Sequence, residues 1–95
     1  MVHIGDVQTF AGVEPTKAQA LKVLEEGAEV FGAWQEWGRA TKGNKAHMNR
    51  RRDELLDECA DVIQATCNLL AALGVEDATL LMLKCRRRNE ERGRL

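Results

Sequence analysis

The sequence has no tyrosine, a single proline and only three cysteines, Cys59, Cys67 and Cys85, which form no C-x-x-C pair. An odd, unpaired set of cysteines argues against a disulfide framework or a zinc site and predicts buried free thiols in a reducing compartment. The sequence also lacks a basic start followed by an apolar run, and any stretch of about 18 apolar residues. We therefore expect no signal peptide, no membrane partner and a cytoplasmic location.

The sequence also lacks an excess of charge of one sign, because it has 14 basic and 15 acidic residues and a net charge of −1. This balance gives no overall attraction to nucleic acid, so no nucleic-acid partner is expected. The length allows one domain, 1–95, and a chain this short buries only about two-thirds of its unfolded surface. We therefore expect a homo-oligomer, either a dimer or a dimer of dimers.

What the sequence does contain is helical periodicity after an irregular N-terminal lead-in, 1–15. A first helix is predicted to begin at Thr16, which forms a capping box with Gln19, and to stop at Gly38. The face expected to pack inward is a stripe at helical spacing: Leu21, Leu24, Ala28 and Phe31.

Two further helices are predicted after a polar loop at 38–49. The second runs from about 49 to 73 and is stopped by Gly74, and the third covers about 76–92. Because few residues join them, we expect the third helix to turn back antiparallel on the second. The predicted fold class is all-α, an antiparallel helical bundle completed by homo-oligomerisation.

Acidic residues form one pair on each of the first two helices. Glu26 and Glu29 project from one face, one turn apart, as do Glu58 and Asp61, and each pair borders an apolar stripe. If the two helices pack through these stripes, four carboxylates meet and must take up protons or bind cations. Oxygen ligands without His or Cys favour Mg²⁺ or Mn²⁺. The alternative is two solvated acidic faces, with Lys22 paired to Glu26.

Residues 25–29 (EEGAE) and 58–61 (ECAD) resemble the paired E-E-x-x-E and E-x-x-D motifs of the MazG-like all-α nucleoside triphosphate pyrophosphohydrolases. The resemblance covers about 16–92. It implies Mg²⁺-dependent cleavage of a nucleoside triphosphate to its monophosphate and pyrophosphate, with Glu25 and Glu26 as catalytic residues. The metal ligands that it implies are Glu26, Glu29, Glu58 and Asp61.

The resemblance also implies that basic and amide side chains of the third helix bind the nucleotide substrate: Lys84, Arg88, Asn89 and Arg92. A basic last turn would alternatively complement the helix dipole. Within the first motif, Gly27 costs about 1 kcal/mol relative to alanine in mid-helix, which a close helix approach would explain. Phe31, Trp34 and Trp37 suit either a subunit interface or the core.

Two other functions remain open. A phosphoribosyl-ATP pyrophosphatase of the same superfamily would show much the same acidic pattern. A non-catalytic helical interaction module would instead use the basic C-terminus on nucleic acid or an acidic partner, without a metal requirement.

Overall fold

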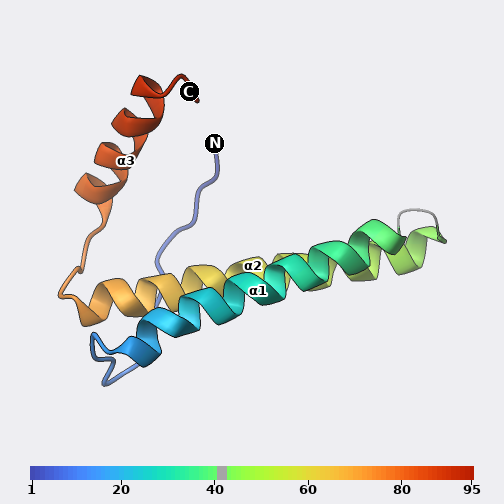
Figure 1. The fold of residues 1–95 in the computed structure, drawn as a ribbon, viewed down its shortest axis with the longest axis horizontal. Helices are drawn as coiled ribbons and strands as arrows, with labels where there is room; N and C mark the ends of the chain where they lie inside the picture. Colours follow the sequence, from blue (N-terminus) through green and yellow to red (C-terminus); the bar gives the residue numbers. More distant parts are fainter. Residues whose placement is uncertain (41–42) are drawn as a thin grey trace.

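Three helices make up the fold in the part of the chain that the structure, a computed structural model, describes, residues 1–40 and 43–95. They are α1 (Lys17–Ala40), α2 (Lys45–Ala72) and α3 (Thr79–Glu91) (Figure 1). Helices α1 and α2 lie side by side as a long antiparallel hairpin, and α3 stands beyond one end of it. The described ranges contain no strand, so the all-α prediction is confirmed.

The starts of α1 and α2 are fixed by side-chain caps. Thr16 Oγ1 accepts from the Gln19 amide at 3.3 Å, whereas the Thr16 amide donates to the Glu14 carbonyl at 2.8 Å, so half of the capping box is formed. Asn44 caps α2 by accepting from the His47 amide at 2.8 Å. The second helix therefore begins before the expected residue 49. Residues 41 and 42 of the expected loop lie outside the described residues.

The end of α2 lies where the sequence predicts it. Gly74 has a φ of +84°, its amide donates to Ala71, and the Val75 amide donates to Leu70, both at 2.9 Å. This is the Schellman arrangement, which requires a left-handed residue after the helix and so favours glycine. Helix α3 begins later than expected, at Thr79, whose amide donates to Asp77 Oδ1 at 2.9 Å.

The expectation that the third helix packs antiparallel on the second is wrong, because α3 contacts neither α1 nor α2 among the described residues. The N-terminal segment lies against α2 instead. The Phe10 amide donates to Asn68 Oδ1 at 3.1 Å, and Gln64 Nε2 donates to the Gln8 carbonyl at 3.0 Å. The irregular lead-in thus lies along one flank of α2.

The predicted inward face of α1 is also wrong, since all four of its residues are exposed, with Leu24 69% and Phe31 59% exposed. The face that meets α2 carries the half-buried Val23, Val30 and Trp37. The two faces have the same 3–4 spacing and differ by two residues in register, which places them roughly 160° apart around the helix.

The core is small for a chain of this length. Among the described residues only Ala40, Ala65 and Asn68 are buried, and Cys59, expected to be buried, is exposed. The radius of gyration is 16.0 Å, against about 12 Å for a compact domain of 95 residues. Within the described ranges, no helix is both long and apolar enough to cross a membrane.

Replacing Asn68 by alanine should detach the N-terminal segment. The Asn68 Oδ1 atom accepts from both the Phe10 amide and Gln64 Nε2, and loss of a buried acceptor costs about 1–3 kcal/mol. Urea unfolding should show this loss, and hydrogen exchange at Phe10 should accelerate. Asn49→Ala, at an exposed position of the same helix, has the same gain in helix propensity and is the matched control. Equal stability and exchange in both variants would contradict this anchor.

Candidate metal centre

Three carboxylates meet across the interface between α1 and α2. Glu26 of α1 and Glu58 and Asp61 of α2 each offer an oxygen, and these oxygens all lie within 4.8 Å of one another. We call this set the carboxylate triad. The prediction that acids from the two helices converge is therefore confirmed for three of the four residues named as ligands.

The register of the helices explains why these acids converge. Glu26 lies on the same face of α1 as Val23 and Val30, and Glu58 lies similarly on α2 between Leu55 and Val62. Both glutamates thus occupy positions where the hairpin would otherwise place apolar side chains. The Glu26 side chain is only 12% exposed, and Glu58 is half-buried, whereas Asp61 is exposed.

Glu29, the fourth expected ligand, lies beside the triad and responds to it electrostatically. The negative charge of Glu26 and hydrogen bonding with Glu58 raise the pKa of Glu29 above its ordinary value of 4.5. A carboxyl group whose ionisation is opposed by its neighbours is one that a divalent cation would stabilise in the ionised form.

One carboxylate oxygen of the triad has a charged partner and another has no hydrogen-bond partner among the described residues. Lys22 Nζ lies 3.2 Å from Glu26 Oε1, so the alternative pairing expected from the sequence is also formed. By contrast, Glu58 Oε2 is buried and has no hydrogen-bond partner in the described structure. A buried carboxylate oxygen without a donor is costly, and lysine neutralises only one end of the cluster.

Glu25, expected to be catalytic, lies outside the triad. Its side chain is 63% exposed, and its Oε2 lies 3.6 Å from Lys22 Nζ. The lysine therefore bridges Glu25 and Glu26, and hydrogen bonding and charge from Glu26, with the charge of Glu25, raise the Lys22 pKa.

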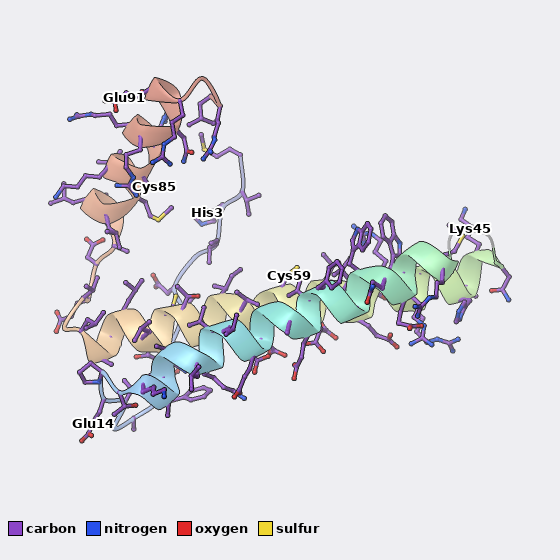
Figure 2. The ribbon with its side chains drawn as sticks, viewed as in Figure 1. His3, Glu14, Lys45, Cys59, Cys85 and Glu91 are labelled. Atoms are coloured by element: carbon purple, nitrogen blue, oxygen red, sulfur yellow. The ribbon has the colours of Figure 1, made fainter. Side chains whose placement is uncertain are left out.

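The structure does not bring the expected substrate-binding residues of α3 to the triad within one chain. Figure 2 shows Cys85 and Glu91 of α3 well away from Cys59, which follows Glu58 on α2. Asn89 is engaged locally, since its Nδ2 donates to the Cys85 carbonyl at 3.1 Å and its Oδ1 accepts from Arg94 at 3.2 Å. The other residues predicted to bind substrate are exposed on α3 or directly after it: Lys84, Arg88 and Arg92.

Arg51 is half-buried and feels the charge of Glu36 on α1, although no sequence motif marks it. Arg51 Nη1 donates to Glu54 Oε2 at 2.9 Å, and hydrogen bonding to Glu54, with a smaller contribution from the charge of Glu36, raises the Arg51 pKa. Counting back from Glu58 and Leu55 by the 3–4 spacing reaches Arg51, so the register of α2 contains the signal.

Comparisons with models of protein families, with curated proteins and with solved structures found no match to this chain.

Glu29→Gln should stabilise the metal-free protein near neutral pH. Because the folded state raises the pKa of Glu29, it binds that proton more tightly than the unfolded chain, and stability falls as pH rises from 4.5 through the raised value. In EDTA, the melting temperature of the variant should exceed that of the wild type near pH 7. The difference should vanish below about pH 4, where the carboxyl group is protonated in both states.

Glu91→Gln, an exposed position on α3, is the control and should show no such pH-dependent difference. A Glu29→Gln protein that melts at or below the wild-type temperature near pH 7 would contradict the repulsion between these carboxylates.

Proposed function

We propose that the chain is a Mg²⁺-dependent nucleotide pyrophosphohydrolase of the MazG-like type, which cleaves a nucleoside triphosphate to its monophosphate and pyrophosphate. The observation that carries this proposal is the carboxylate triad, formed from the two motifs that resemble that superfamily. The buried Glu58 Oε2 without a partner supports it, because this oxygen lacks the compensating interaction that a cation would provide.

The donor set fits magnesium better than zinc or copper. All of the converging groups are carboxylates, and no His or Cys belongs to the triad. Mn²⁺ suits the same oxygens. The proposed ligands are the triad and Glu29, whose raised pKa a cation would lower again. Bound Mg²⁺ would neutralise phosphate charge and lower the pKa of a coordinated water.

The chain's own residues would divide the remaining work. Glu25 and Glu26 lie next to each other at the end of the cluster that Lys22 bridges, and Glu25 is exposed to solvent. We assign to the Glu25 carboxylate the positioning of the attacking water and the acceptance of its proton. The α3 side chains assigned to the phosphates are Lys84, Arg88, Asn89 and Arg92, and they reach the triad only if α3 approaches it, from the same chain or another copy.

Purified protein should release pyrophosphate from at least one member of a panel of canonical and damaged nucleoside triphosphates with Mg²⁺ or Mn²⁺. Glu58→Gln and Asp61→Ala should each lower turnover about 100-fold or more, since a cation contributes several kcal/mol to charge stabilisation. Asp53→Asn, an exposed acid on the same helix, is the matched control and should leave turnover unchanged.

Release of orthophosphate alone would contradict cleavage at the proposed bond, and full turnover in Asp61→Ala would contradict the ligand assignment. Activity confined to phosphoribosyl-ATP would favour the phosphoribosyl-ATP pyrophosphatase of the same superfamily.

The free-standing α3 favours one alternative, a non-catalytic interaction module. Leu80 and Met82 are 72% and 60% exposed, and cations follow them along the helix. This function predicts salt-sensitive binding of nucleic acid in EDTA. The proposed enzymatic function predicts instead that Mg²⁺ and a non-hydrolysable nucleotide together raise the melting temperature of the protein. Glu58→Gln should abolish this rise.

Lys22→Gln should tighten binding of Mn²⁺ several-fold in calorimetric titration, because the lysine ammonium lies 3.2 Å from Glu26 Oε1 and competes with a cation for that oxygen. Lys45→Gln, which removes an equal charge from the exposed start of α2, is the control. Unchanged or weaker binding in Lys22→Gln would contradict competition between the lysine and a metal at the triad.

A further inference from the structure

A cavity of about 480 Å³ lies on α2 between the N-terminal segment and the linker 73–78, which joins α2 to α3 (Figure 1). Its floor is apolar and comes from three half-buried side chains of α2, namely Ile63, Cys67 and Leu70. Val7 of the N-terminal segment and Val75 of the linker, also half-buried, extend this apolar lining. We call the cavity the outer groove, because Cys67 lies on the opposite side of α2 from Glu58 by helical position.

Exposed acidic side chains form the rim of the outer groove. Asp6 of the N-terminal segment and Glu76 and Asp77 of the linker line it, and none of the described residues that line it is basic. The ion pairs within the described ranges engage other acids, so no basic side chain there pairs with Asp6 or Glu76. Asp77 Oδ1 accepts from the hydroxyl and the amide of Thr79 at 2.6 and 2.9 Å, which lowers the pKa of Asp77 and favours its charged form. The rim therefore places negative charge around an apolar floor.

The size and the charge of the outer groove indicate the chemical class of its ligand. A volume of about 480 Å³ lies in the range of small-molecule sites, about 300–1,000 Å³. An apolar floor beneath carboxylates suits a cation with an aliphatic body, because methylene groups can lie on the floor while ammonium groups stay in water at the rim. A ligand with one ammonium group would leave two of the three carboxylates without a counter-charge. Charge complementarity therefore favours several ammonium groups on one aliphatic chain.

We propose that the outer groove binds a linear aliphatic polyamine. The methylene chain of the ligand lies over Ile63 and Leu70, and its ammonium groups pair with the carboxylates of Asp6 and Glu76. These two acids belong to parts of the chain that are far apart in sequence and carry the same charge into one groove. A polyamine between them replaces their mutual repulsion with attraction and joins the N-terminal segment to the linker.

The proposed polyamine site is separate from the carboxylate triad, and it depends neither on metal binding nor on catalysis. No member of the triad lines the outer groove. The triad is also anionic and would offer a polyamine a second site, so substitutions must locate the ligand. Glu58→Gln removes charge from the triad alone, whereas Asp6→Asn combined with Glu76→Gln removes charge from the outer groove alone.

Attachment of the N-terminal segment to α2 provides a second readout of binding. The Gln8 carbonyl and the Phe10 amide, shortly after Asp6 in the sequence, are hydrogen-bonded to Gln64 and Asn68 of α2. A ligand that pairs with Asp6 and lies on α2 holds this segment in place. Local opening of the segment then becomes rarer, so hydrogen exchange at the Phe10 amide should slow when the polyamine is bound.

Calorimetric titration with spermidine tests the proposal, at low ionic strength because salt screens exposed charges, and without divalent cations. The wild type should show saturable binding. Asp6→Asn combined with Glu76→Gln should weaken this binding about 10-fold or more, since two charge pairs are lost. Asp53→Asn combined with Glu91→Gln removes the same charge from exposed positions outside the outer groove and is the matched control. The probe n-butylammonium, which has one ammonium group, should bind the wild type about 10-fold more weakly or less.

Saturating spermidine should also slow hydrogen exchange at Phe10 in the wild type and in Glu58→Gln, but not in the double variant at Asp6 and Glu76. A wild type without saturable spermidine binding would overturn the proposal whether or not the variants fold. Binding that is the same in the double variant and its control, or that is lost in Glu58→Gln, would place the polyamine elsewhere and overturn it equally. Equal affinity for n-butylammonium and spermidine would contradict a ligand with several ammonium groups.

Discussion

Carboxylates of α1 and α2 repel one another at the contact between the two helices. Glu26 and Glu58 occupy inward positions of the two helices, where Val23, Val30 and Val62 supply the packing. Apolar residues at these two positions would join the helices at lower electrostatic cost. The hairpin instead holds acids there. Lys22 Nζ, 3.2 Å from Glu26 Oε1, offsets part of the repulsion, and the raised pKa of Glu29 favours its uncharged form. The proposed metal chemistry would need these charges together, and it would offset the cost that the interface retains.

The same arrangement explains why the hairpin alone has so little core. A helix pair has one shared interface, and here part of that interface is given to acids, so the apolar residues cannot all be buried within it. Only two apolar residues, Ala40 and Ala65, are buried in the described part of the chain. The exposed stripe of α1 carries Leu24 and Phe31, which are larger than either of these alanines. Part of the free energy available from apolar burial therefore lies on a face that the single chain leaves exposed.

Convergence of the acids was predictable because it depends on local spacing. Glu58 and Asp61 are three residues apart, and any contact through the neighbouring apolar positions brings them toward α1. The inward face of α1 was not predictable in this way, because α1 carries two stripes of equal period, two residues apart in register, and the stripe with the larger side chains, Leu24 and Phe31, is the exposed one. The more hydrophobic stripe of α1 is the exposed one, so hydrophobicity alone predicts the wrong inward face. The N-terminal segment has no period, and two hydrogen bonds attach it to α2, from the Phe10 amide to Asn68 Oδ1 and from Gln64 Nε2 to the Gln8 carbonyl.

The hairpin has an acidic side and an apolar side, and these lie on opposite faces of α1. Glu29 and Phe31 are two residues apart in sequence yet lie on opposite sides of α1, so a substitution at one leaves the surroundings of the other unchanged. The exposed apolar side chains of α1 can therefore change without moving the carboxylates, and the carboxylates can be neutralised without exposing more apolar surface. Only the shared face with Val30 and Trp37 links the two sides, since it sets the distance between α1 and α2. A change in that face would alter the separation of Glu26 from Glu58 and Asp61, so the geometry of the carboxylate triad depends on the packing of α1 against α2.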